Sequence, residues 1–235
     1  MLTRPHRYYD NSFLSPDIEL TATSAMPFTL EKFCTLRSCA YHVCGAVNFT
    51  SIRSSRFLLS ASTLLSGTAY EHLLRARRSS SLVVPVNGRS VEIRDHRPLV
   101  PRSLSLPDGY TVEDFVGELN ARVFFWVGTE SGPVRSGKNH IARYASEGAV
   151  YILRVPLANL LRANPTEALQ VTFCNSGSAR HNQGLPAFRS PATFQAPAEA
   201  SRSAAEVIEL TYRAQAILPP ETCYSTSLSG PWALL

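Results

Sequence analysis

The sequence predicts an α+β fold, and three observations support that prediction. Short runs with strand character are interleaved with short amphipathic helical runs, which favours α+β over a regular parallel α/β sheet. Asn87-Gly88 lies between two β-rich runs, and this dipeptide favours the type I′ turn of a hairpin. With 235 residues and 44% hydrophobic content, the chain can bury one core. We therefore expect a single domain at 27–235 after a polar extension at 1–26.

Capping and periodicity define the elements expected in the first half of the domain. Thr29 precedes apolar residues at helical spacing and can cap a helix. The expected helices are 29–36, 46–53 and 62–78, the last ending in arginines that suit a helix C-terminus. The expected strands are 40–43, 57–60, 82–86 and 90–93, the last two forming the hairpin.

The second half begins with a helix through Leu119 that Thr111 can cap, since two acidic residues follow in its first turn. Further helices are expected at 139–145 and 156–161, and strands at 122–127, 149–155, 168–173 and 205–212. The segment 175–195 is predicted to be a loop, and loops of this length tend to be functional or disordered. Its Arg180, His181 and Arg189 could cover phosphates or hold an acceptor.

Composition limits the function classes. The net charge of +5 and the pI of about 9.1 fit an anionic partner, but NAD and nucleic acid fit equally well. No apolar run approaches the roughly 20 residues of a membrane span, and the N-terminus lacks the apolar region of a secretory signal. Five cysteines, an odd number, favour free thiols in a reducing compartment. We expect a cytoplasmic protein without a membrane segment.

Two sequence patterns resemble sites that we do not predict. Cys34, Cys39 and Cys44 flank His42, but their spacing is unlike the Cys pairs of zinc sites, so no metal site is expected. The segment 132–138 matches the phosphate-binding pattern G-x4-G-K. The match is interpreted as a surface turn, because an asparagine follows where a magnesium-ligating hydroxyl is needed.

Three separate places hold candidate functional residues, each with an ordinary structural alternative. His42 in an expected strand could equally be a core or edge histidine. The aromatic run 124–126 could be core, although three consecutive aromatic residues must place a ring on each sheet face. Glu209 alternates with apolar neighbours and could simply face solvent. Glu206 is the competing carboxylate, and in an ideal strand the two face opposite sides.

A resemblance connects these places. Over residues 28 to about 220 the chain resembles an uncharacterised bacterial family through four segments, which include the specific strings LNARVFFW and NSGS: 40–42, 119–126, 173–178 and 189–194. The order of elements in that family is similar to the DarT-type DNA ADP-ribosyltransferases, with a Tyr-His strand, a central aromatic strand and a terminal glutamate strand. The chain departs from the DarT pattern at 128–130, where an arginine is missing, and this departure bears on a DNA target more than on NAD binding.

The resemblance implies an ADP-ribosyltransferase-like split β-sheet sandwich flanked by short helices, with NAD as substrate. Glu209 would be the catalytic acid, with Glu206 as the alternative. The implied NAD-binding residues are Tyr41, His42, Ser60, Phe124, Phe125 and Trp126. The acceptor would be a nucleic acid or a protein, and a toxin-like enzyme of this kind could have an antitoxin partner. The alternatives are an NAD glycohydrolase and an inactive module of the same fold that binds a nucleotide or a partner.

Overall fold

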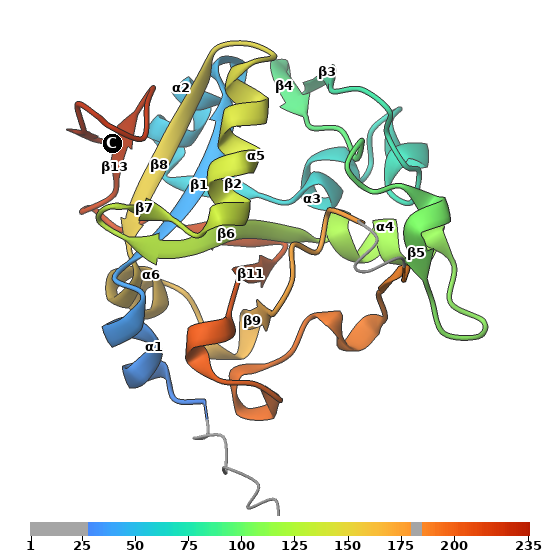
Figure 1. The fold of residues 1–235 in the computed structure, drawn as a ribbon. Helices are drawn as coiled ribbons and strands as arrows, with labels where there is room; N and C mark the ends of the chain where they lie inside the picture. The colour runs from blue at the N-terminus through green and yellow to red at the C-terminus, as the bar shows by residue number, and fades with distance from the viewer. Residues whose placement is uncertain (1–27, 180–184) are drawn as a thin grey trace, which may run out of the picture.

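A large antiparallel sheet organises the computed structural model, which describes residues 28–179 and 185–235 (Figure 1). The expected extension at 1–26 therefore lies outside the described residues. The sheet has eight strands in the order β14-β13-β8-β1-β6-β11-β9, with β7 paired to β6. Its strands are β1 (Cys39–Gly45), β6 (Arg122–Thr129), β7 (Gly132–Pro133), β8 (Val150–Pro156), β9 (Leu169–Thr172), β11 (Glu209–Arg213), β13 (Cys223–Ser225) and β14 (Ala233–Leu234). Together with several helices, this sheet confirms the α+β class.

Three two-stranded sheets flank the large one: β3 (Leu82–Val86) with β4 (Arg89–Ile93), β2 (Phe57–Leu59) with β12 (Gln215–Ile217), and β5 (Leu104–Ser105) with β10 (Ala187–Phe188). The β3–β4 hairpin confirms the turn prediction. Asn87 and Gly88 have φ angles of 51° and 75°, as a type I′ turn requires. The expected loop at 175–195 contributes the short parallel strand β10 within its described part.

The helices are short: α1 (Leu30–Leu36), α2 (Ala46–Ser55), α3 (Ala61–Leu65), α4 (Val112–Asn120), α5 (Arg135–Ala145) and α6 (Leu157–Ala163). Single 3-10 turns lie at η1 (Glu71–Leu73), η2 (Pro101–Ser103), η3 (Thr166–Ala168), η4 (Pro191–Thr193), η5 (Pro197–Glu199) and η6 (Ala204–Glu206). Thr29 accepts a hydrogen bond from the Lys32 amide and so caps α1. Thr111 and Asp114 form a reciprocal capping box at α4. Both caps were predicted from the sequence.

Two expected elements are shorter than predicted. The helix expected at 62–78 ends at Leu65, because Gly67 adopts a φ of 72° and leaves the helical path. Arg78 does not cap a helix; its buried guanidinium donates to the backbone oxygens of Leu73 and Arg94. The strand expected at 205–212 begins only at Glu209, since the preceding residues form η6.

Side-chain alternation along β6 supplies core residues to both faces of the large sheet. Val123, Phe125 and Val127 belong to the larger apolar cluster. Trp126 points to the opposite face, where it packs in a second cluster that contains residues of α5. Figure 1 shows α5 lying across this second face.

The large sheet opens between β1 and β6. β1 pairs with β8 over seven residue pairs, but with β6 over only three, ending at Tyr41↔Trp126. The next residue of β1, His42, contacts the Phe124 carbonyl through its ring instead of its backbone. The large antiparallel sheet thus parts beyond Tyr41.

Candidate functional site

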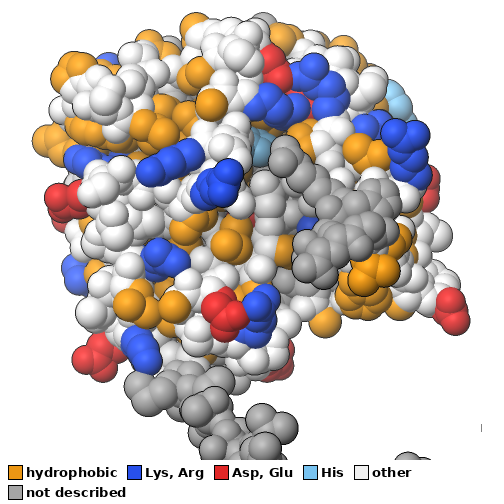
Figure 2. Space-filling model, viewed as in Figure 1, with side chains coloured by type: hydrophobic (Ala, Val, Ile, Leu, Met, Phe, Trp, Pro, Cys, Tyr) orange, Lys and Arg blue, Asp and Glu red, His pale blue; other side chains and the backbone are white. Residues whose placement is uncertain are grey.

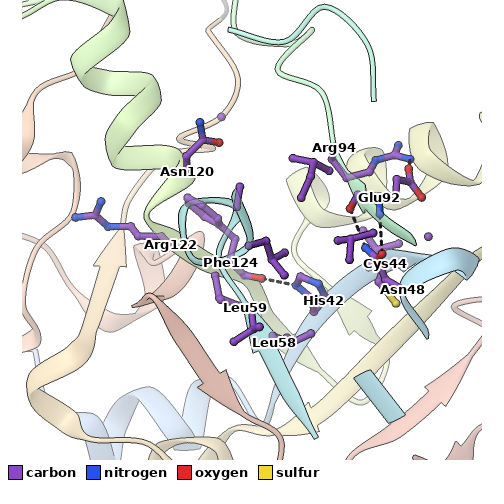
Figure 3. Close-up of a pocket in the computed structure, with 18 of the residues that line it drawn as sticks. His42, Cys44, Asn48, Leu58, Leu59, Glu92, Arg94, Asn120, Arg122 and Phe124 are labelled. Atoms are coloured by element: carbon purple, nitrogen blue, oxygen red, sulfur yellow. Dashed lines mark hydrogen bonds and ion pairs between the residues drawn. The ribbon is translucent and has the colours of Figure 1, made fainter. Parts of the chain in front are cut away.

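A cavity of about 300 Å³ lies where β1 and β6 separate. This volume is at the small end of the range for ligand sites. Residues from β1, α2, β2, the β3–β4 hairpin, β6, α5 and β11 line it, and Figure 3 shows the His42 ring joined to the Phe124 carbonyl on its wall. The lining includes four residues singled out from the sequence: His42, Phe124, Trp126 and Glu209.

The register between β6 and β11 explains why aromatic rings and a carboxylate share this cavity. Glu209 pairs with Trp126, and Thr211 pairs with Phe124. Directly paired residues point to the same face of an antiparallel sheet, and every second residue does so along one strand. Phe124, Trp126 and Glu209 therefore share one face.

Glu209 is a deeply buried carboxylate of the cavity, with only 3% of its surface exposed. Its Oε2 accepts hydrogen bonds from the Ser176 amide at 3.1 Å, the Ser176 hydroxyl at 2.7 Å and the Thr172 hydroxyl at 3.1 Å. Desolvation by burial raises the pKa of Glu209 above its ordinary value, while the Ser176 and Thr172 donors oppose that shift. Burial is the larger effect.

Glu206, the competing carboxylate, lies elsewhere. It ends the 3-10 turn η6, where its Oε2 accepts hydrogen bonds from the amide and hydroxyl of Ser203 at 3.2 and 3.1 Å. It also forms an exposed ion pair with Arg202. Glu206 does not line the cavity, so the geometry assigns the cavity carboxylate to Glu209.

His42 stands where the sheet opens. Its Nδ1 lies 2.9 Å from the Phe124 carbonyl oxygen. A carbonyl can only accept, so Nδ1 carries the proton and Nε2 remains a hydrogen-bond acceptor. Desolvation by burial lowers the pKa of His42 below its ordinary value, so the ring is neutral at pH 7.

The other three predicted NAD-binding residues do not line the cavity. Tyr41 lies in the second apolar cluster, and its hydroxyl donates a hydrogen bond to the Thr129 carbonyl. Ser60 caps α3 through a hydrogen bond from the Thr63 amide. Phe125 points into the larger cluster on the face opposite Phe124. Strand alternation accounts for Phe125 and a helix cap accounts for Ser60. Tyr41 is paired with Trp126 and shares its face, but it packs in the second apolar cluster.

Several cavity residues were not predicted from the sequence. The wall contains the two further histidines His96 and His140, and burial lowers the pKa of each to about 3, so both are uncharged at pH 7. The His140 ring packs on Trp126 with centroids 4.5 Å apart. On the hairpin side, Asn48 exchanges two hydrogen bonds with the Glu92 backbone. No local pattern marked these residues, because they come together only through the tertiary fold.

Arginines on the cavity wall are largely neutralised or hydrogen-bonded within the protein. Arg94 pairs with Glu92 at 2.6 Å, and its guanidinium carbon lies 3.5 Å from the centre of the Tyr144 ring. Arg122 pairs with Glu118 at 2.6 Å. Arg78 donates to the Asn120 amide oxygen at 2.8 Å, and its burial lowers its pKa to about 10. The wall therefore carries no concentrated positive charge.

The segment 132–138 does not form a phosphate-binding loop. Helix α5 already begins at Arg135, so Gly137 and Lys138 are helical. A Cβ at Gly137 would lie 2.7 Å from Trp126, which shows that this glycine permits close packing of α5 on β6. The interpretation of the match as fortuitous agrees with this geometry, although Gly137 is buried instead of exposed.

The long loop at 175–195 also differs from expectation. Arg180 and His181 lie outside the described residues. Arg189 points inward and donates to the backbone oxygens of Asn175, Ser178 and Phe188, so it holds the loop together instead of presenting its charge to a ligand.

A family model matches residues 38–217, and the chain belongs to that family, DUF7002, a family of unknown function. This match confirms the expectation of an uncharacterised domain. Neither the curated proteins nor the solved structures compared with the chain gave a match. Within the part of the chain that the structure describes, no helix has the length and apolar character to cross a membrane.

Proposed function

We propose that this chain is an NAD-dependent ADP-ribosyltransferase whose active site is the cavity between His42 and Glu209. One observation carries the proposal: a buried carboxylate, two aromatic side chains and a neutral histidine, from three strands far apart in sequence, line the same cavity. A buried carboxylate with a raised pKa in a cavity is a candidate functional group on physical grounds alone.

The proposed reaction breaks the bond between nicotinamide and C1′ of its ribose. Nicotinamide leaves with the bonding electron pair, and positive charge develops on the ribose. The ionised Glu209 stabilises that charge, and it takes the proton that the acceptor loses as its oxygen or nitrogen bonds to C1′. The protein supplies mainly electrostatics and orientation.

The aromatic side chains suit the leaving group. The nicotinamide ring of NAD is a flat cation, and Phe124 and Trp126 provide ring surfaces on the Glu209 face. His42, with Nε2 free to accept, can receive a hydrogen bond from a ribose hydroxyl or from the carboxamide. These contacts would place C1′ between the aromatic rings and the carboxylate.

The acceptor is proposed to be a nucleic acid or a protein. Figure 2 shows Lys and Arg side chains spread among hydrophobic and uncharged atoms, not gathered into one continuous patch on this face. The net charge of +5 is therefore not concentrated on the face that Figure 2 shows, and the charge on that face does not favour nucleic acid over protein as the acceptor.

The decisive experiment incubates the purified full-length protein with NAD, alone and with DNA, RNA or cell lysate. Nicotinamide release together with a labelled acceptor supports ADP-ribosyl transfer. Release without any labelled acceptor identifies an NAD glycohydrolase. NAD binding without release identifies an inactive binding module, and the absence of both contradicts the proposal.

A further inference from the structure

The segment 175–178 contacts the Glu209 carboxylate from the loop after β9. Ser176, which has no exposed surface, directs both its amide and its hydroxyl to Oε2. The Thr172 hydroxyl also reaches Oε2, but its single proton has a nearer acceptor in the Cys174 carbonyl at 2.7 Å. Ser176 is therefore the principal donor. Oε1 receives none of these hydrogen bonds.

Arg189 holds this segment in place. Its guanidinium donates to the carbonyl oxygens of Asn175 and Ser178 at 2.9 Å and to that of Ser176 at 3.4 Å. Arg189 is only 7% exposed, and within the described residues it forms no ion pair with a carboxylate. An arginine that binds successive carbonyl oxygens fixes the backbone conformation, because its planar donors match only one arrangement of the loop.

We propose that Ser176 and Arg189 are positioning residues for the cavity carboxylate: Arg189 fixes the loop at 175–178, and Ser176 anchors Oε2 so that Oε1 faces the substrate. This inference rests on the proposed function, because it gives Glu209 the catalytic role. Neither residue needs to touch NAD. Their effect is to restrict a flexible side chain to one orientation before substrate binds.

The same contacts favour the ionised form of Glu209. Burial raises the pKa of this carboxyl, and the hydrogen bonds from Ser176, with the positive charge of Arg189, act in the opposite direction. Removing either group is therefore expected to raise the pKa of Glu209 further. A loop contact that does not reach the carboxylate would not have this effect.

The chain contains a matched control for this arrangement. Ser203 directs its amide and hydroxyl to Oε2 of Glu206, as Ser176 does to Glu209. Glu206 is exposed, Ser203 is half-buried, and neither lines the cavity. Ser203→Ala therefore removes the same kind of hydrogen bond without touching the site.

The test titrates the full-length protein labelled with 13C at the glutamate carboxyl groups, with the Glu209 signal assigned by its loss in Glu209→Gln. Ser176→Ala is expected to move the Glu209 midpoint to higher pH, and Arg189→Met to do the same. Ser203→Ala should leave the Glu209 midpoint unchanged. An unchanged midpoint in Ser176→Ala overturns the positioning role, whatever the activity of the protein.

Kinetics provide the second measurement. Losing a hydrogen bond to a charged group costs about 1.5–3 kcal/mol, so Ser176→Ala should lower kcat roughly 10- to 100-fold. KM for NAD should stay within about twofold, because Ser176 acts on the carboxylate and not on the substrate. A rise in KM at constant kcat would contradict the positioning role. If the Glu209 midpoint shifted in Ser176→Ala but the wild type released no nicotinamide, the proposed function would be overturned. The coupling between Ser176 and Glu209 would still stand.

Discussion

Glu209 and Trp126 are direct partners in the antiparallel strands β11 and β6, so the carboxylate and the indole project from the same face. Trp126 in turn contacts His140 of α5, and Glu209 contacts Ser176 of the loop after β9. The register of these two strands thus brings α5, β6 and the loop at 175–178 together at a single cavity.

Glu209→Gln should reduce nicotinamide release by about 100- to 1000-fold while NAD binding persists, because the change removes the charge but keeps the shape. Initial rates at saturating NAD measure the first effect, and the thermal shift on adding NAD measures the second. Glu206→Gln is the matched control and should retain full activity, since Glu206 is exposed outside the cavity. Equal rates for wild type and Glu209→Gln would rule out the catalytic role.

The activity should have an acidic limb above the ordinary glutamate range. Only ionised Glu209 stabilises the developing positive charge, and burial raises the pKa of this group from about 4.5. The rate kcat/KM should therefore increase with pH through that raised pKa. A pH–rate profile of the free enzyme that is flat from pH 4.5 upward would contradict this assignment.

The same pKa shift predicts that Glu209 costs stability at neutral pH. A carboxyl whose pKa is raised in the folded state stabilises the fold in its protonated form. Its contribution to the free energy of unfolding is therefore present below about pH 4.5 and is lost as pH rises through the folded pKa. Glu209→Gln should therefore match or exceed the wild-type Tm at pH 7, and its advantage should shrink as pH falls towards 4.5. Calorimetry across this pH range measures the trend, and a lower Tm for the variant at pH 7 would oppose it.

Local signals in the sequence predicted most of the elements but not how they meet. The Asn87-Gly88 turn and the Thr111 cap act on their immediate neighbours, and both form as expected. The helix expected at 62–78 stops at Leu65, because Gly67 adopts a positive φ and Arg78 donates to the backbone oxygens of Leu73 and Arg94 instead of ending a helix. His42 and Glu209 could be predicted as candidates, whereas Ser176 depends on the pairing of β9 with β11 and needed the structure.

Gly137→Ala should destabilise the protein, although alanine is normally the better helix residue. The added Cβ would lie 2.7 Å from Trp126 and 2.9 Å from Pro133, so α5 would have to move away from β6. Overpacking of this kind typically costs about 1–3 kcal/mol. Denaturant unfolding measures the loss, and Gly148→Ala is the control because its Cβ would meet open space. Equal stability of wild type and Gly137→Ala would show that α5 shifts freely.

Phe124 and Phe125 are neighbours on one strand, and their substitution by leucine should separate binding from stability. Phe124 lines the cavity, so Phe124→Leu removes a ring that can stack on the cationic nicotinamide and should raise KM for NAD about 3- to 10-fold. Phe125 is fully buried on the opposite face, so Phe125→Leu should instead cost about 1–3 kcal/mol in unfolding free energy with KM nearly unchanged. Steady-state kinetics and denaturant unfolding on both variants make the comparison. If Phe125→Leu alone raised KM, the cavity face of β6 would be wrongly assigned, and if neither did, NAD would bind without the aromatic strand.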